Sequence, residues 1–131
     1  MSQAKLVLYA DDDEDDRFCL QEAWLSHTGY ELRLFESGVE LITFLGTNPS
    51  PDVCFIILDQ NMPQFTGIES LERIRQMKAF EHTPVVLYST NVQAGNFTQA
   101  QSTLKVHLVQ KPNSMAEINA VADRIIKLCG S

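Results

Sequence analysis

Five short apolar runs alternate along the chain with longer amphipathic segments, which is the pattern of a domain that alternates strands and helices. The run Val53–Leu58 is apolar at every position, as expected for a strand that is buried on both faces of a parallel sheet. The run Glu31–Phe35 alternates polar and apolar residues, so we expect a more exposed strand there. The five predicted strands are Leu6–Ala10, Glu31–Phe35, Val53–Leu58, Val85–Ser89 and Val106–Val109.

Each predicted strand is followed by a segment with the character of a helix, and most of these segments carry apolar residues at helical spacing. The first has acidic residues in its first turn and Asp13 as a suitable N-cap, whereas the fourth has few apolar residues. The regular alternation predicts an α/β fold, a doubly wound (βα)5 flavodoxin-like parallel sheet with strand order 2-1-3-4-5. The predicted helices are Glu14–Ser26, Gly38–Leu45, Gly67–Met77, Val92–Thr103 and Ser114–Leu128.

The length and composition of the chain exclude several classes of protein. The length of 131 residues and the 44% share of apolar residues predict one domain over residues 1–131. The formal net charge of −7 argues against a nucleic-acid-binding surface, and most of it comes from the acidic run at residues 11–16. No apolar run approaches the roughly 18 residues that a membrane span needs, and the three cysteines form no metal-binding or disulfide pattern. We therefore expect a soluble, cytoplasmic protein that contacts neither nucleic acid nor membrane.

Polar residues follow four of the five predicted strands, at the sheet edge where parallel sheets bind their ligands. Three carboxylates gathered there would repel one another, and a divalent cation would relieve the repulsion. Oxygen ligands without Cys or His favour magnesium, with manganese or calcium as alternatives. A carboxylate, a hard cation, a lysine and a hydroxyl are the groups needed to bind and transfer a phosphoryl group. The strand-end residues are Asp11, Asp12, Asp59, Ser89, Thr90 and Lys111.

Four motifs give the chain a resemblance to response-regulator receiver domains, the CheY-like family of two-component signalling. Their order and spacing match the family over essentially the whole chain, from about Lys5 to Cys129. The motifs are Tyr9-Ala10-Asp11-Asp12, then Leu58-Asp59-Gln60-Asn61-Met62-Pro63 with Gly67, then Pro84-Val85-Val86-Leu87-Tyr88-Ser89, and finally Lys111-Pro112.

The resemblance implies a role for each matching residue of the site. Asp59 matches the aspartate that accepts a phosphoryl group from a phosphohistidine and that also binds Mg²⁺. Asp12 would bind the Mg²⁺ directly and Asp11 mainly through water, and the backbone carbonyl of Asn61 would be a further ligand. Lys111 would pair first with Asp59 and then with the phosphoryl group.

The resemblance also implies a switch region. Ser89 matches the hydroxyl that moves toward the phosphoryl group, Thr90 stands where a small residue is usual, and Asn91 matches a position that tunes phosphoryl lifetime. Leu108 replaces the Tyr or Phe of many members, so we expect phosphorylation with a smaller output change or one that takes another route. The family further suggests a cis peptide bond before Pro112.

Together these features predict a stand-alone receiver in a two-component system or phosphorelay, acting as a switch rather than as a multi-turnover enzyme. The expected partners are a sensor histidine kinase or phosphotransfer protein and an unidentified target protein, and dimerisation is left open. The alternative is a receiver-like docking module that works without phosphorylation. A haloacid-dehalogenase-type phosphatase is disfavoured because Asp15 stands where Thr or Val belongs, and a calcium loop because Asp16 replaces the turn glycine.

The remaining polar and aromatic residues have structural interpretations. The acidic residues from Asp13 to Asp16 are interpreted as a solvated helix start that the helix dipole stabilises. The side chains of Phe18, Trp24 and Phe44 are expected in the core.

Overall fold

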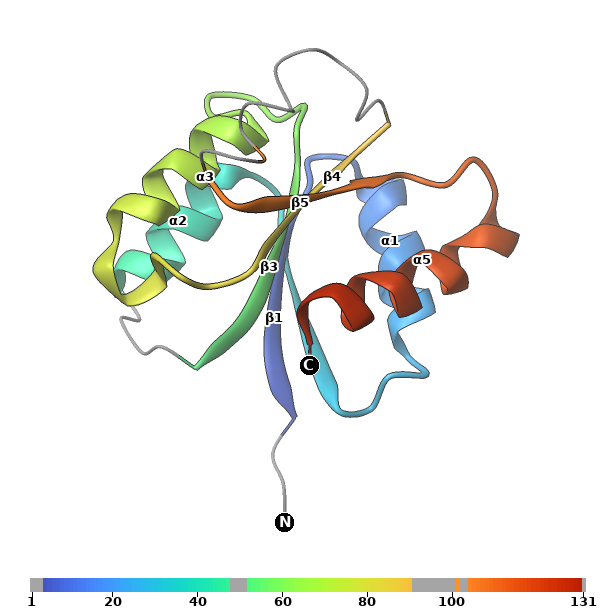
Figure 1. Cartoon of the computed structure of the whole chain (residues 1–131). Helices are drawn as coiled ribbons and strands as arrows, with labels where there is room; N and C mark the ends of the chain where they lie inside the picture. Colours follow the sequence, from blue (N-terminus) through green and yellow to red (C-terminus); the bar gives the residue numbers. More distant parts are fainter. Residues whose placement is uncertain (1–3, 48–51, 91–100, 102–103, 131) are drawn as a thin grey trace.

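A five-stranded parallel sheet runs through the centre of the computed structural model, with helices against both of its faces (Figure 1). The structure describes residues 4–47, 52–90, 101 and 104–130. The elements are β1 (Lys5–Ala10), α1 (Glu14–Trp24), β2 (Tyr30–Phe35), α2 (Gly38–Thr47), β3 (Val53–Asp59), α3 (Gly67–Gln76), η1 (Lys78–Phe80), β4 (Val85–Ser89), β5 (Val106–Gln110) and α5 (Met115–Cys129). The strand order is β2-β1-β3-β4-β5, which confirms the predicted order.

The observed elements agree closely with the sequence pattern. Every strand begins and ends within one residue of its predicted bounds, and α1, α2, α3 and α5 do so within two residues. Nearly all of the predicted helix Val92–Thr103 lies outside the residues that the structure describes. Among the described helices, none is both long enough and apolar enough to cross a membrane.

Side-chain caps fix the starts of two helices next to the sheet edge. The carboxylate of Asp13 accepts hydrogen bonds from the backbone N–H groups of Asp15 at 2.8 Å and Asp16 at 3.1 Å, as its position in the sequence predicts. At α3, the Thr66 hydroxyl accepts from the Glu69 backbone, and the Glu69 carboxylate accepts from the Thr66 backbone. This capping box and the Asp13 cap set where the two helices leave the sheet.

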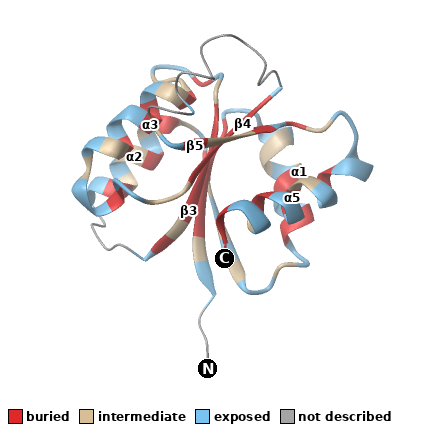
Figure 2. Ribbon diagram, in the orientation of Figure 1, coloured by how far each residue is buried: buried red, intermediate tan, exposed pale blue. Residues whose placement is uncertain are grey.

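Two hydrophobic layers cover the sheet, one on each face (Figure 2). Successive residues of a strand point to opposite faces, so Leu8 and Leu58 pack toward α2 and α3, whereas Tyr9 and Ile57 pack toward α1 and α5. The helices therefore form two separate pairs, with α2 beside α3 and α1 beside α5. The sheet is buried on both sides, and its carboxyl-terminal edge is left to carry polar groups.

The expectation of a buried Phe18 is wrong, because this side chain is 56% exposed. The buried face of α1 is formed by Leu20, Ala23 and Trp24. Phe18 precedes Leu20 by two residues, which is about 200° around a helix, so it points away from the sheet. Trp24 is buried as expected, and Phe44 is half-buried against the ring of Phe35.

Arg75 joins α3 to the two loops that lead into β4 and β5. Its guanidinium donates hydrogen bonds to four backbone carbonyl oxygens, those of Phe80 (3.1 Å), Thr83 (2.7 Å), Leu104 (2.9 Å) and Lys105 (3.2 Å). The fork of N–H groups on one side chain can reach all four acceptors, which a lysine ammonium with three hydrogens could not.

Replacing Arg75 with lysine is expected to lower the free energy of unfolding by about 2 kcal/mol, since it leaves some of these carbonyls without a donor. Urea unfolding would measure the loss. Arg124→Lys on the exposed face of α5 is the matched control and should change stability by no more than about 0.5 kcal/mol. Equal effects of the two substitutions would contradict the assignment of Arg75 as the link between the loops.

Candidate functional site

The strand ends bring the predicted site residues to one edge of the sheet. Asp11 follows β1 and Asp59 ends β3, and these strands are neighbours, with Ala10 paired to Leu58. Ser89 ends β4, and its backbone carbonyl accepts a hydrogen bond of 2.8 Å from the backbone N–H of Lys111, which follows β5. Four stretches of the chain that are far apart in sequence therefore meet at this edge, as the sequence predicts.

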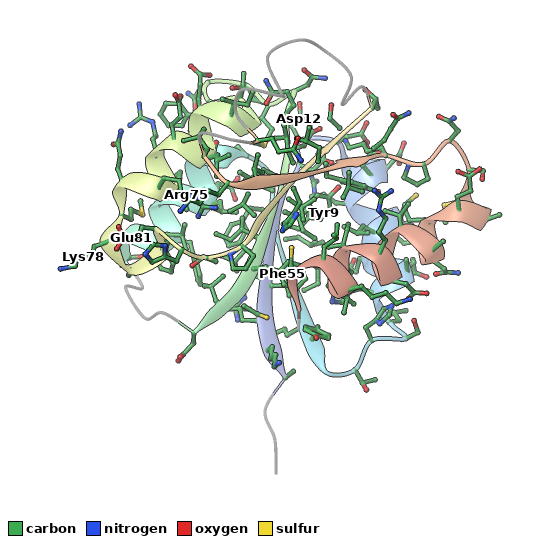
Figure 3. All side chains as sticks on the ribbon, in the orientation of Figure 1. Tyr9, Asp12, Phe55, Arg75, Lys78 and Glu81 are labelled. Atoms are coloured by element: carbon green, nitrogen blue, oxygen red, sulfur yellow. The ribbon has the colours of Figure 1, made fainter. Side chains whose placement is uncertain are left out.

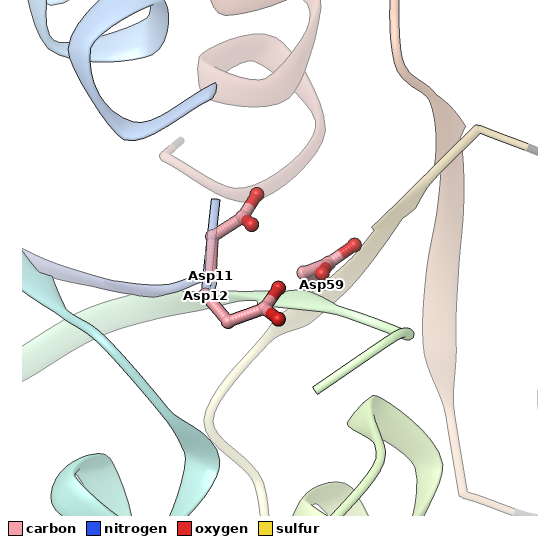
Figure 4. Close-up of side chains that lie close together, drawn as sticks. All are labelled: Asp11, Asp12 and Asp59. Carbon is pink, nitrogen blue, oxygen red and sulfur yellow. The ribbon is translucent and has the colours of Figure 1, made fainter. Parts of the chain in front are cut away.

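Three carboxylates form an acidic cluster at this edge (Figure 4). Asp11, Asp12 and Asp59 each offer one oxygen, and these oxygens all lie within 4.8 Å of one another. Asp11 and Asp59 are buried, at 0% and 4% exposure, whereas Asp12 is exposed. The cluster offers only oxygen donors of the kind that hard divalent cations prefer, which fits the predicted metal-binding residues.

The side chain of Lys111 reaches into the site and contacts three carboxylates. Its Nζ donates at 2.9 Å to Asp11 Oδ2 and at 2.8 Å to Asp16 Oδ2, and lies 3.0 Å from Asp59 Oδ1. Burial alone would lower the pKa of Lys111, but the hydrogen bonds that it donates to Asp16 and Asp11 outweigh burial and hold the pKa above its usual value. Lys111 is therefore a permanent cation beside Asp59.

Asp59 is a buried carboxylate with an altered proton affinity. Burial and then the negative charge of Asp11 raise its pKa, the hydrogen bond from Lys111 lowers it, and the net result is a pKa of about 6. The side chain is consequently ionised for the most part at neutral pH, which is the state that a carboxylate nucleophile requires.

Asp11 is fixed on both of its oxygens. The Tyr9 hydroxyl donates to Oδ2 at 2.6 Å, and the backbone N–H of Asp13 donates to Oδ1 at 3.0 Å. Arg17 Nη1 also donates to the backbone carbonyl of Asp11 at 2.7 Å, which holds the start of α1 against the end of β1. Burial raises the pKa of Tyr9, and the Asp11 charge raises it further, so the phenol stays protonated as the donor.

Tyr9 and Asp16 are site residues that the sequence analysis missed. Tyr9 lies two residues before Asp11, and the period of a strand places both side chains on the same face, so alternation could have identified it (Figure 3 labels Tyr9). The interpretation of Asp16 as part of a solvated helix start is wrong in one respect: its side chain is only 39% exposed and pairs with Lys111. Only the fold brings Asp16 and Lys111 together.

The switch-region positions occupy different environments. Ser89 is buried, Thr90 is exposed, and Asn91 lies outside the described residues. Leu108 is half-buried, pairs with Leu87 of β4, and packs against the core on the side of α2 and α3. The roles of these four positions stay predictions.

The expectation of a cis bond before Pro112 is wrong, because no peptide bond between described residues is cis. The trans form is favoured by about 0.5–1 kcal/mol in X–Pro bonds, and Lys111 reaches its three carboxylates with the bond in this form. Asn61 lies two residues beyond Asp59 and has an exposed side chain, and its predicted use of the backbone carbonyl as a metal ligand stays an expectation.

Gly67 allows α3 to begin directly against the end of β3. A Cβ atom at this position would lie 2.6 Å from the backbone oxygen of Asp59 and 2.7 Å from Leu87 Cδ1. The backbone N–H of Gly67 also donates to the Gln60 carbonyl at 3.0 Å. Because Gly67 has no side chain, the loop after Asp59 can fold back directly against the end of β3.

Gly67→Ala is expected to lower the free energy of unfolding by about 1–3 kcal/mol, because the added methyl group overlaps rigid backbone. Gly46→Ala is the control: a Cβ on this exposed residue of α2 meets nothing within 4 Å, so we expect a gain of about 0.5–1 kcal/mol. Urea unfolding of both variants tests the prediction, and a neutral Gly67→Ala would show that the strand end tolerates displacement.

Comparison with known proteins agrees with the fold. A family model described as the response regulator receiver domain matches residues 7–123. Two-component response regulator ORR7 of rice (Oryza sativa subsp. japonica) is 26% identical over 92% of this chain, and the chain spans only 56% of that protein.

Two solved structures are similar over nearly their whole length. The phosphorylated cyanobacterial phytochrome response regulator RcpA has a TM-score of 0.85 at 24% identity, covering 98% of this chain and 96% of its own. The Mn²⁺-bound form of response regulator Rcp1 has a TM-score of 0.81 at 26% identity, covering 94% of this chain and 92% of its own. The chain belongs to the response regulator receiver domain family of two-component signalling.

Proposed function

We propose that Asp59 accepts a phosphoryl group from the phosphohistidine of a sensor histidine kinase or phosphotransfer protein, with Mg²⁺ held at Asp11, Asp12 and Asp59. The observation that carries this proposal is the position of Asp59, whose oxygen lies 3.0 Å from the Lys111 ammonium and within 4.8 Å of oxygens from both other acidic residues. A nucleophile, a fixed cation and oxygen ligands thus meet at one point.

The transfer is balanced without any further reactant. An ionised oxygen of Asp59 attacks phosphorus, an O–P bond forms, and the bond from phosphorus to the imidazole nitrogen breaks, with its electron pair leaving on the imidazole. When bound, Mg²⁺ would offset negative charge on the carboxylates and on the transferred oxygens. Lys111 donates to a phosphoryl oxygen, and Ser89, at the end of the adjacent β4, supplies a hydroxyl on the same edge.

The surface beside Lys111 suits the arrival of a phosphodonor protein. A cavity of about 190 Å³ opens between α1 and the loop after β5, and its lining includes Lys111, Asp16 and Met115. Met115, which lines this cavity, exposes a large apolar side chain, at 55%. Exposed apolar groups around a reactive centre are what a transient protein partner would cover.

The phosphorylated chain would act as a switch through protein contacts. We place it in the cytoplasm as a single receiver over residues 1–131, with a target protein or a second copy as the partner that reads its state. Leu108 stands where many family members have an aromatic residue that moves on phosphorylation. Because Leu108 packs against the core on the side of α2 and α3 and pairs with Leu87, we expect the change on phosphorylation to be transmitted by a backbone movement near β4. The competing function is a docking module that works without phosphorylation.

Intact mass after incubation with Mg²⁺ and acetyl phosphate distinguishes the two functions. The wild type should gain one phosphoryl group, and the gain should vanish with EDTA or in Asp59→Asn. Asp52→Asn removes an exposed carboxylate just before β3 and should behave as the wild type does. No mass gain, or an equal gain in Asp59→Asn, would favour the docking module.

A further inference from the structure

Asp16 is a third partner of Lys111 with no part in the proposed metal site. Its Oδ2 accepts a hydrogen bond of 2.8 Å from Lys111 Nζ, which is as close as the contacts with Asp11 and Asp59. It does not belong to the cluster of three carboxylates that could hold a cation. Its contribution must therefore pass through the lysine.

We propose that Asp16 is a positioning residue that holds the Lys111 ammonium beside Asp59 before and during phosphoryl transfer. The proposal rests on the proposed function, because it assigns Asp16 a role in the same reaction. Phosphoryl transfer would then require a hydrogen-bond acceptor in the first turn of α1 as well as the cluster of Asp11, Asp12 and Asp59.

Hydrogen-bond geometry supports this role. An ammonium has three hydrogens and no acceptor, and the three carboxylates around Lys111 use all three. The lysine follows β5, which within the described sheet pairs only with β4, and the Tyr88 ring of β4, 5.6 Å from Nζ, offers the ammonium no oxygen acceptor. With only two acceptors, the ammonium would be free to leave the geometry in which it faces Asp59.

The element that carries Asp16 is itself fixed. Asp13 caps α1, and Arg17 ties the first turn of this helix to the backbone of Asp11 at 2.7 Å. A side chain on a rigid helix turn holds its partner more closely than one on a loop. Lys111 is also anchored through its backbone N–H to the Ser89 carbonyl, so the side chain is held at both ends.

Asp16 is the partner that phosphoryl transfer leaves unchanged. One oxygen of Asp59 becomes bonded to phosphorus, so Lys111 must exchange its contact with Asp59 for one with a phosphoryl oxygen. Asp11 would share its oxygens with a bound cation. The hydrogen bond from Lys111 to Asp16 can persist throughout, which keeps the ammonium at the developing charge.

Two substitutions of Asp16 distinguish the effect of its hydrogen bond to Lys111 from the effect of its negative charge. Asp16→Ala removes the acceptor and should lower the maximal rate constant of phosphorylation by acetyl phosphate about tenfold or more at saturating Mg²⁺. The half-saturating concentration should not rise, because a negative charge near an anionic donor has been removed. Asp16→Asn keeps an acceptor without the charge and should restore most of the rate. Asp15→Ala removes an exposed charge from the same turn and should match the wild type.

The ¹⁵N signal of the Lys111 ammonium provides a readout that does not depend on phosphorylation. In unphosphorylated protein it should be protected from solvent exchange in the wild type and Asp16→Asn, and lost in Asp16→Ala. If the wild type takes up no phosphoryl group, the proposed function fails, and a signal retained in Asp16→Ala would separately overturn the role of Asp16. If the wild type is phosphorylated, an unchanged or faster rate in Asp16→Ala overturns it.

Discussion

Replacing Lys111 with methionine is expected to lower the free energy of unfolding of the metal-free protein by about 3–5 kcal/mol near neutral pH. Methionine keeps most of the length of the side chain but removes the charge. Asp11 and Asp59, which are 0% and 4% exposed, would then be buried beside each other without a cation. Leaving one member of a buried ion pair uncompensated is among the most costly single changes in a protein.

Lys78→Met is the matched control for this prediction. Lys78 is exposed on η1 and points away from the protein (Figure 3), so its loss should change stability by no more than about 0.5 kcal/mol. Urea unfolding with EDTA gives the difference, and added Mg²⁺ should recover part of the loss in Lys111→Met by offsetting the same carboxylates. Equal stability of the two variants would show that the ammonium does not compensate the buried charges.

Asp59→Asn is expected to raise the stability of the metal-free protein by about 2–3 kcal/mol above pH 6. The folded pKa of Asp59 is about 6, higher than the value of about 4 that an aspartate has in an unfolded chain. The native state therefore binds this proton more tightly, and the wild type loses stability as the pH rises from about 4 through 6. Asparagine cannot ionise, so the variant escapes this loss.

The pH dependence distinguishes this cause from better packing. The advantage of Asp59→Asn should be close to zero at about pH 4, grow through pH 6 and then stay constant, when urea unfolding is measured with EDTA present. Asp52→Asn, which removes an exposed carboxylate, is the control and should stay within about 0.5 kcal/mol of the wild type. A constant advantage at every pH, or a loss of stability in Asp59→Asn, would contradict a raised pKa at this site.

The fold could be predicted from the sequence because each strand leaves a local signal. Val53–Asp59 is an apolar run that ends in an acidic residue, and Val85–Ser89 is bounded by a proline and ends in a hydroxyl. Since parallel strands end at the same edge, the order of these runs is enough to bring Asp11, Asp59 and Lys111 together. The same periodicity misplaced Phe18, because several registers of α1 bury a large residue and only the packed sheet selects one.

The contacts of the site could not be predicted in the same way. The pair of Asp16 and Lys111 joins residues that are 95 positions apart, and it depends on how far the β5 end lies from the first turn of α1. The trans bond before Pro112 reflects a preference of under about 1 kcal/mol, which sequence alone does not resolve. Local patterns thus predict where charged groups emerge, whereas distances between elements decide which of them pair.

Chemical identification of the modified residue shows directly whether Asp59 accepts the phosphoryl group. After incubation with Mg²⁺ and acetyl phosphate, borohydride reduction converts a phosphorylated aspartate into homoserine, which peptide mass spectrometry locates in the sequence. We expect homoserine at position 59 alone, and none when EDTA replaces Mg²⁺. Homoserine at position 11 or 12 instead, or at no position, would contradict the assignment of Asp59 as the phosphoryl acceptor.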